Sequence, residues 1–242
     1  MESIHKTIRV FAPASSANLG CGFDVMGMAL DGIGDVLRIA MSEGDGLTIR
    51  NASAAELPED IEKNVITPAV RAFMAAAGKK ACLEIVVEKK IRPGSGIGSS
   101  AASSAAAVFG LNELYGRPFS LPELVSFAME GEKLISGTAH ADNSAPAVMG
   151  GIVLIRGYQP LDLVRLPVPD SFCFAVVHPH IVVSTKAARD VLRKEIPMRE
   201  AVTQWGNVGG LVAGIMTGDL PLIGRSMRDV VVEPYRKGFI PG

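Results

Sequence analysis

Hydrophobic and charged residues alternate from residue 82 to residue 91, and the alternation places Leu83, Ile85 and Val87 on one face of the segment. A period of two predicts a half-buried strand. The next pattern, Ser99 to Tyr115, contains no proline and is dominated by alanine, so it predicts a helix. Glycines and serines separate the two segments. The sequence therefore predicts a strand, a glycine loop and a helix N-terminus in direct succession.

Similar patterns predict further elements on both sides of this unit. Two local signals mark helix starts, because Thr67 before Pro68 is a good N-cap and Ser120-Leu-Pro-Glu123 matches a capping box. Strands are predicted over Thr7–Ala12, over Leu47–Arg50 and over Ser171–His178, and Val25–Ala40 is predicted to form separate strands joined by Gly32 and Gly34. Helices are predicted over about residues 67–77, 120–135, 184–196, 200–217 and 220–231.

The stretch from Gly157 to Pro169 is rich in proline and predicts a loop at a domain boundary. We therefore expect an N-terminal domain over residues 1–157 and a C-terminal domain over residues 158–242. A chain of 242 residues with 48% hydrophobic and 20% charged residues has ample length for a buried core and an ordinary globular composition.

The net charge limits the kinds of molecule that the protein is expected to bind, and the cysteine content indicates its cellular compartment. The formal net charge is -1, which gives no electrostatic case for binding nucleic acid or an anionic membrane. Cys21, Cys82 and Cys173 are widely spaced and odd in number, which argues against a disulfide framework or a zinc knuckle. The sequence shows neither a signal-peptide core nor an apolar run long enough to span a bilayer. We expect a cytoplasmic protein with a small-molecule partner.

The glycine loop is the strongest candidate for chemistry. The first turn of a helix has backbone N–H groups without intrahelical partners and carries partial positive charge, so it favours anions. Gly94, Gly96 and Gly98 would let the backbone approach a phosphate, and Ser95 would supply a hydroxyl. The loop lacks the Gly-Lys-Ser/Thr of a Walker A motif, and Ser99 stands where a dinucleotide fingerprint has its last glycine. A flexible linker and a tightly packed small-residue helix without a ligand are the alternatives.

Other polar residues are weaker candidates. A bound nucleotide needs a divalent cation, and Glu130 or Glu132 at a helix end could supply an oxygen ligand, unless both are solvated charges. His178-Pro-His180 has the spacing of a zinc pair but no nearby third ligand. Arg189 and Arg236 could each bind a carboxylate, or be ordinary surface arginines. The residues alone predict a phosphate-binding protein of mixed α and β structure that uses ATP.

Five blocks of the sequence share features with one known family: Pro13–Asp24, Gly94–Ala102, Gly137–Pro146, Ser184–Arg189 and Glu233–Gly242. Together they resemble the GHMP kinases, and within that family the members that phosphorylate homoserine. The loop block departs from the family pattern at Arg92 and Ile97, and the first block has Cys21 where proline is usual. The resemblance implies an α+β, two-domain GHMP kinase fold, with a ribosomal protein S5 domain 2-like N-terminal domain and an incomplete ferredoxin-like C-terminal domain.

The resemblance also implies an activity, the transfer of the ATP γ-phosphoryl group to the hydroxyl of L-homoserine, which gives O-phospho-L-homoserine in threonine biosynthesis. Ser99 and Glu132 would bind Mg²⁺, and Asn64 would lie beside the adenine. The phosphates would be wrapped by Ile91, Arg92, Pro93, Gly94, Ser95, Gly96, Ile97, Gly98, Ser99, Ser100 and Ala101. The hydroxyl and amino ends of the substrate would be held by Asn18 and Asp24 with His140 and Asn143, and its carboxylate by Thr185, Arg189 and Arg236.

The resemblance leaves alternatives open. Asp24 could act as a catalytic base, but the first block has no partner lysine, so we favour an orienting role with the proton leaving through the phosphate. Another small-molecule kinase of the family, or a nucleotide-binding module without turnover, would fit the same motifs. Homoserine-phosphorylating members are expected to continue past Gly242 through a third glycine-rich motif. We therefore expect a C-terminally truncated chain, and a homodimer is left open.

Overall fold

The sheet of the molecule joins strands that are far apart in the sequence. The computed structural model describes residues 6–54, 57–58, 60–177, 181, 183 and 185–240, apart from the side chains of residues 136, 185 and 186. Within these residues, six strands form one sheet in the order β3-β4-β2-β5-β6, with β1 also paired to β2. The strands are β1 (Lys6–Ala17), β2 (Met26–Ser42), β3 (Gly46–Asn51), β4 (Cys82–Glu88), β5 (Ile152–Tyr158) and β6 (Leu161–Leu166).

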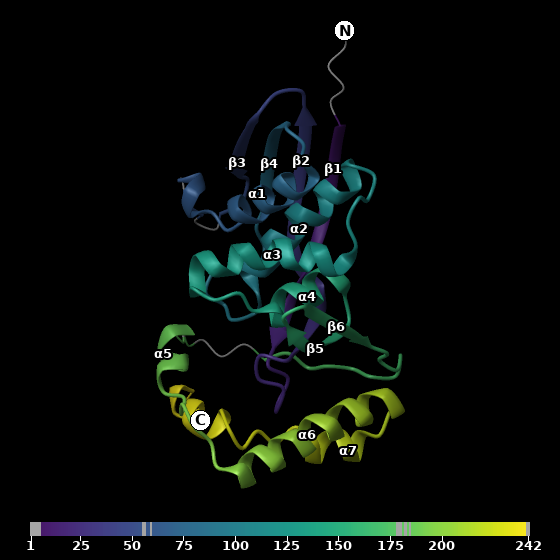
Figure 1. The fold of residues 1–242 in the computed structure, drawn as a ribbon, viewed down its shortest axis with the longest axis vertical. Coiled ribbons are helices and arrows are strands. Elements are labelled where there is room, and N and C mark those ends of the chain that lie inside the picture. Colours follow the sequence, from purple (N-terminus) through teal and green to yellow (C-terminus); the bar gives the residue numbers. More distant parts are fainter. Residues whose placement is uncertain are drawn as a thin grey trace.

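Helices cover one face of this sheet (Figure 1), and α2 is central among them because it contacts β1, β2, α1, α3 and α4. The regular elements described after β6 are all helices, and these helices lie at the end of the molecule away from the N-terminus (Figure 1). The helices are η1 (Ile61–Lys63), α1 (Ile66–Ala77), α2 (Ser99–Leu114), α3 (Leu121–Ser136), α4 (Ala141–Met149), α5 (Thr185–Asp190), α6 (Met198–Thr217), α7 (Leu220–Ser226), α8 (Glu233–Arg236) and η2 (Lys237–Phe239).

The composition of α2 follows from its position. Its side chains are buried almost all the way round, since the sheet lies on one side and three helices lie on the others. A Cβ atom at Gly110 would come within 2.6 Å of Ile39 Cδ1 and 2.9 Å of Val10 Cγ2. Only small residues allow so close an approach to the sheet. Helix α2 is therefore a tightly packed helix of small residues, one of the alternatives that the sequence left open, and it supports the glycine loop.

The predicted helix signals are largely confirmed. Gly78 ends α1 with a left-handed φ of 60°, and the Glu123 carboxylate accepts hydrogen bonds from the backbone N–H and the hydroxyl of Ser120 at the start of α3. The predicted cap at Thr67 is wrong. Helix α1 begins at Ile66, because the Asn64 side chain accepts the Ile66 N–H at 3.0 Å, whereas Thr67 donates its hydroxyl to a backbone oxygen.

Two strand predictions were too short. β1 continues through Pro13 to Ala17, with a register shift between Pro13 and Ala14 that accommodates the missing N–H. The region predicted as separate strands joined at Gly32 and Gly34 forms one long strand, β2. β1 pairs with β2 on both sides of residues 31–33, where the register shifts, and this pairing keeps β2 one strand across Gly32.

The predicted loop at residues 157–169 is wrong. β5 and β6 pair antiparallel in this region, with Gln159 and Pro160 at the turn. The pairing continues from Tyr158 opposite Leu161 to Ile152 opposite Leu166. The boundary predicted between residues 157 and 158 therefore falls inside a hairpin of the main sheet.

Predictions beyond β6 are partly corrected. The core strand predicted over Ser171–His178 is wrong for the part that the structure describes, because residues 171–177 have no strand partner in the described chain, and Phe174 and Val177 are exposed. Helices α5 and α7 are shorter than predicted, ending at Asp190 and Ser226, whereas α6 matches its predicted range closely. The predicted cap Ser184 lies outside the described residues.

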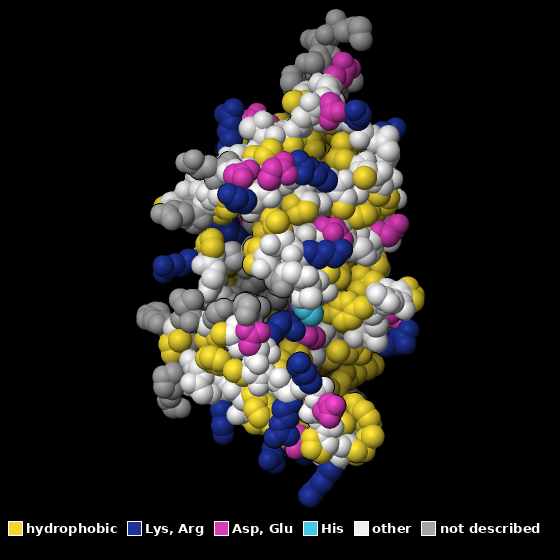
Figure 2. Space-filling model, turned by 60° about the vertical axis from the view of Figure 1, so that its left-hand side comes forward, with side chains coloured by type: hydrophobic (Ala, Val, Ile, Leu, Met, Phe, Trp, Pro, Cys, Tyr) yellow, Lys and Arg dark blue, Asp and Glu magenta, His cyan; other side chains and the backbone are white. Residues whose placement is uncertain are grey.

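Figure 2 shows one face of the molecule, on which basic and acidic side chains are interspersed with hydrophobic ones. This mixture matches the formal net charge of -1. Among the helices that the structure describes, none is long and apolar enough to cross a membrane.

Candidate active site

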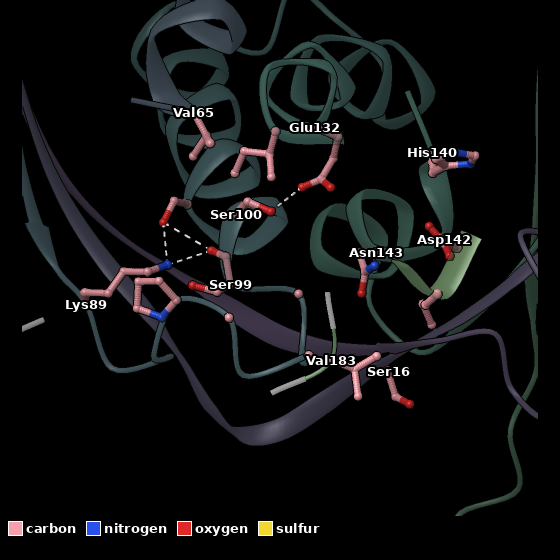
Figure 3. A pocket seen from close by; sticks show the side chains of 18 of the residues that line it. Ser16, Val65, Lys89, Ser99, Ser100, Glu132, His140, Asp142, Asn143 and Val183 are labelled. Carbon is pink, nitrogen blue, oxygen red and sulfur yellow. Dashed lines mark hydrogen bonds between the residues drawn. The ribbon is translucent and has the colours of Figure 1, made fainter. Parts of the chain in front are cut away.

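A cavity of about 560 Å³ opens between the glycine loop, the first turns of α2 and α4, and the helices near the C-terminus. Figure 3 shows Lys89 and Ser99 at one end of this cavity and His140 and Asp142 at the other, with Glu132 between them. Segments from β1, β4 and several helices meet here, so the tertiary fold assembles the site.

The loop between β4 and α2 has the backbone shape of an anion cradle. Gly94, Gly96 and Gly98 have φ values of 78°, 77° and 68°, in the left-handed region that favours glycine. A Cβ atom at Gly94 or Gly96 would meet no atom within 4 Å, so both positions border open space. The Ser95 hydroxyl is buried and has no hydrogen-bond partner within the described chain. A phosphate oxygen would supply one.

Helix α2 adds backbone donors to this loop. The N–H of Ala102 makes the first intrahelical bond, to the oxygen of Gly98 at 2.9 Å. The amides of Ser99, Ser100 and Ala101 therefore come before the intrahelical ladder, at the positive end of the helix dipole. Loop and helix together fit a polyphosphate.

A buried ion pair supports the loop from beneath. The Lys89 ammonium, just after β4, contacts the carboxylate of Asp35 on β2, and the two side chains are 3% and 0% exposed. Lys89 also donates to the oxygen of Ser99 at 2.6 Å and to the hydroxyl of Ser103 at 2.9 Å. The other oxygen of Asp35 accepts the N–H groups of the two residues after Lys89, both at 2.9 Å. The pair thereby joins the sheet, the start of the loop and α2.

Ser99, Ser100 and Glu132 provide oxygens where a divalent cation would fit. The Ser99 hydroxyl donates to the oxygen of Ile91 at 3.1 Å, and the Ser100 hydroxyl donates to the Glu132 carboxylate at 2.5 Å. Burial raises the pKa of Glu132, and a bound cation would offset that cost. Within the described chain no three His, Cys, Asp or Glu residues gather as a metal cluster. One carboxylate with serine oxygens suits Mg²⁺, which usually keeps water and phosphate ligands.

The cavity wall beside α1 is largely apolar. Leu57, Pro58, Val65 and Ile66 line it, together with Asn64. Asn64 is 4% exposed, and its side-chain oxygen accepts the N–H of Ile66 at the start of α1. Apolar walls with few polar groups are typical of a site for a planar base.

At the opposite end, Asn18 and Asp24 shape a turn after β1. Both have positive φ, 65° and 57°, which is uncommon for residues other than glycine. The Asn18 side-chain oxygen accepts the Asp24 N–H at 2.9 Å. Arg189 donates two hydrogen bonds to the Asp24 carboxylate, at 2.9 and 3.1 Å. Strained residues of this kind concentrate at functional sites.

His140 and Tyr158 complete the surroundings of Asp24. His140 Nδ1 lies 3.8 Å from an Asp24 carboxylate oxygen, and burial lowers the pKa of His140, so the ring is largely neutral at pH 7. The Tyr158 hydroxyl donates to the backbone oxygen of Asp24 at 2.9 Å and accepts the N–H of Ala141 at 3.3 Å. Burial raises the pKa of Tyr158 to about 12, so it remains a donor.

Two guanidinium groups flank the ring of Phe23. Arg189 lies 5.5 Å and Arg236 lies 4.6 Å from its centroid. Arg236 also donates its Nε–H to the oxygen of Ala188 at 2.8 Å. Arg189 has the Asp24 carboxylate as its partner, but among the described residues no carboxylate lies within ion-pair distance of Arg236.

Ser15 joins the phosphate loop to the opposite end of the cavity. Its hydroxyl donates to the Asn143 side-chain oxygen at 2.8 Å, and its N–H donates to the oxygen of Ile97 at 3.1 Å. A Cβ atom at Gly98 would collide with this hydroxyl and lie 2.9 Å from Asn143 Oδ1. The position therefore needs glycine for its space as well as for its φ.

The structure brings most of the predicted site residues to this cavity and places others behind it. Ile91 and Ala101 are buried supports, Ile97 packs against the core, and Arg92 is exposed. For Thr185 the structure describes the backbone alone, and His178-Pro-His180 lies outside the described residues. The lining contains Asn18, Asn64, Pro93, Gly94, Gly96, Gly98, Ser99, Ser100, Glu132, His140, Asn143, Arg189 and Arg236.

The sequence assigned no role to Asp35, Lys89 or Asp142, although Asp142 stands in a polar cluster with His140 and Asn143. Lys89 and Asp142 line the cavity, and Asp35 holds Lys89 from the sheet. Asp35 stands among the apolar residues of Val25–Ala40 and Lys89 directly follows β4, so neither position by itself indicates a buried ion pair. The position of Asp142 directly before Asn143, at a helix start, was the available signal.

Comparison with known proteins agrees with this geometry. The family model described as "GHMP kinases N terminal domain" matches residues 64–151, which include the glycine loop and the first turn of α4. The mevalonate kinase of L. major, solved with R-mevalonate, shares the fold at a TM-score of 0.66 and 18% identity, covering 92% of this chain and 73% of that one. The fold is therefore that of the GHMP kinases.

Similarity to homoserine kinases is much higher. Homoserine kinase of Chlorobium phaeobacteroides is 43% identical over 98% of this chain and 78% of its own length, and that of Natronomonas pharaonis is 44% identical over 97% and 77%. The crystal structure of homoserine kinase from Cytophaga hutchinsonii superposes with a TM-score of 0.89 at 46% identity, covering all of this chain and 77% of that one. The chain belongs to the homoserine kinase family.

Proposed function

We propose that the protein transfers the γ-phosphoryl group of ATP to the hydroxyl of L-homoserine and so supplies O-phospho-L-homoserine for threonine biosynthesis. One observation carries the proposal. A single cavity has a phosphate cradle at one end and a cluster of carboxylate and guanidinium groups at the other. The membership of the chain in the homoserine kinase family supports the same assignment.

The nucleotide would lie along the cavity with its base beside Asn64. The loop from Ile91 to Ala101 would hold the phosphates through backbone N–H groups and the Ser95 hydroxyl. Ser99 and Glu132 would hold Mg²⁺, which would neutralise charge on the phosphates. The Lys89 ammonium keeps the start of α2 in place through its bond to the oxygen of Ser99.

The amino-acid substrate would occupy the other end. Arg189 and Arg236 offer the planar donors that suit a carboxylate. Asn18 and Asp24, with His140 and Asn143, would orient the hydroxyl and amino groups. Backbone strain at Asn18 and Asp24 supports this role. The Thr185 side chain is assigned to carboxylate binding by family resemblance.

Catalysis would rest on positioning and charge neutralisation. The substrate hydroxyl oxygen forms a bond to the γ-phosphorus, the bond from that phosphorus to the ADP oxygen breaks, and the hydroxyl proton passes to a phosphoryl oxygen. Asp24 accepts two hydrogen bonds from Arg189, which fix the position of its carboxylate. The pair supports an orienting role for Asp24.

An ADP-release assay tests the proposal. We expect ADP release from ATP with Mg²⁺ to require L-homoserine, and the product to be O-phospho-L-homoserine. ADP release with mevalonate or galactose but not with L-homoserine would select another kinase of the family. Calorimetric binding of ATP without turnover of any alcohol would select a nucleotide-binding module.

A further inference from the structure

Ser15, on β1, is a buried residue that joins three elements of the site. Its side-chain hydroxyl donates to the side-chain oxygen of Asn143 on α4 at 2.8 Å, and its backbone N–H donates to the oxygen of Ile97 in the glycine loop at 3.1 Å. Gly98 makes room for this contact, because a Cβ atom there would collide with the Ser15 hydroxyl and lie 2.9 Å from Asn143 Oδ1. The bond between the two side chains therefore lies directly against the phosphate loop.

This bond fixes which end of the Asn143 amide faces a ligand. The side-chain oxygen accepts from Ser15, whereas the amino group, Nδ2, has no hydrogen-bond partner within the described chain. Asn143 lines the cavity, and in Figure 3 it lies between Ser99 and Asp142, which belong to the two ends. The opposite orientation would turn the amide oxygen toward the place of an anionic phosphoryl group, which would repel it. Ser15 thus holds Asn143 as a hydrogen-bond donor toward the cavity.

The orientation of the amide matters for phosphoryl transfer to a hydroxyl group. An N–H that donates to the hydroxyl oxygen occupies one lone pair, so the other can attack phosphorus and the hydroxyl proton can point to a phosphoryl oxygen. An amide oxygen at the same place would accept that proton and direct it away from the phosphoryl group. The donor orientation is therefore the one that lets the proton leave through the phosphate.

We propose that Ser15 is a positioning residue for phosphoryl transfer, which holds the Asn143 amide with its amino group toward the substrate hydroxyl. This inference rests on the proposed function and adds to it the residue that sets the orientation of Asn143. Ser15 is 0% exposed, and the described lining of the cavity contains Asn143 but not Ser15. Ser15 therefore acts through Asn143 and not by contact with the substrate.

Steady-state kinetics of the whole chain with ATP, Mg²⁺ and L-homoserine test this role. Ser15→Ala removes the hydroxyl but keeps the backbone bond to Ile97, so the KM for ATP should stay nearly unchanged. The kcat should fall roughly 10- to 100-fold, as expected when a buried amide oxygen loses its partner and the amide can rotate. Ser15→Thr keeps the hydroxyl and should recover most of kcat.

Ser104→Ala is the matched control. Ser104 is also 0% exposed, and its hydroxyl donates to a backbone oxygen, that of Val65, at 3.2 Å. Denaturant unfolding should show similar stability losses in Ser15→Ala and Ser104→Ala, because each removes one buried hydroxyl. Only Ser15→Ala should lose kcat.

A double-mutant cycle separates positioning from a general loss of packing. Asn143→Ala should lower kcat by itself, and Ser15→Ala should add no further loss in that background, because Ser15 acts through the Asn143 side chain. A purely structural effect of Ser15 would instead add to the effect of Asn143→Ala.

Several results would overturn the inference. They are normal kcat in Ser15→Ala, additive losses in the double variant, and an equal loss of kcat and of ATP affinity, which would assign Ser15 to support of the glycine loop. If wild-type protein phosphorylates L-homoserine, each of these results rejects the role of Ser15 and leaves the proposed function standing. If wild-type protein does not phosphorylate L-homoserine, the proposed function and this inference fail together.

Discussion

Lys89 and Asp35 form a buried ion pair between the end of β4 and the middle of β2, and this pair positions the first turn of α2. The Lys89 ammonium contacts the Asp35 carboxylate, the oxygen of Ser99 and the hydroxyl of Ser103, so its three donors are all used. The glycine loop is thereby supported by the sheet although it lies at the surface of a cavity.

Lys89→Met should therefore be strongly destabilising. It would leave the Asp35 carboxylate buried without its cation, which costs about 3–5 kcal/mol. Denaturant unfolding would measure the loss. Lys80→Met breaks an exposed pair with Asp45 and should leave the unfolding midpoint almost unchanged. Equal effects of the two changes would contradict a supporting role for Lys89.

Gly98→Ala should abolish tight ATP binding. The added methyl group would collide with the Ser15 hydroxyl at a φ of 68°, and the first turn of α2 would have to move. Gly78→Ala is the matched control, because Gly78 has a φ of 60° but nothing within 4 Å of the added atom. Both variants should lose about 1–2 kcal/mol to backbone strain. Calorimetry with ATP should separate them, since normal affinity in Gly98→Ala would argue against the cradle.

Glu132→Gln should lower kcat about 10²- to 10³-fold at saturating Mg²⁺, as expected when a group that stabilises transition-state charge is removed. Glu130→Gln, two residues away on the same helix, removes a carboxylate that pairs with Lys133 and should keep near wild-type kcat. Steady-state kinetics across Mg²⁺ concentrations would measure both. An unaffected Glu132→Gln enzyme would rule out the metal role.

Asp142→Asn should stabilise the ligand-free protein at neutral pH. The pKa of Asp142 rises from 3.8 to about 6 on folding, because of burial and the charges of Asp24 and Glu132, with Arg189 opposing. The unfolded state therefore ionises first, and the wild type loses stability between these two pH values, by roughly 3 kcal/mol in full. Thermal melts should show no advantage of the variant below pH 4 and a constant advantage above pH 7. A variant less stable than wild type at pH 8 would show that the carboxylate has a stabilising partner.

Local signals in the sequence were sufficient for the elements that organise the site. The alternation around Ile85, the alanine helix and the glycines between them predicted β4, α2 and the loop, since each depends on residues close in sequence. The capping residues of α3 were predicted for the same reason. The family resemblance then predicted that most of the residues that line the cavity belong to one site.

Pairing between strands explains the wrong strand predictions, because a strand forms only where the fold supplies a partner. β1 runs through Pro13 because β2 pairs with it on both sides of the register shift, and β6 forms a strand because β5 is its partner. The predicted core strand after residue 171 has no such partner in the described chain.

The sequence by itself determined the glycine loop, the helix that begins at Ser99 and the membership of a kinase family, because these depend on local backbone preferences and on contiguous motifs. Only the tertiary structure decided that Lys89 pairs with Asp35, that Arg189 pairs with Asp24, and that Asp142 is buried beside the cavity without a cation. Charges far apart in the chain acquire partners, or lack them, only when the fold brings them together and removes water.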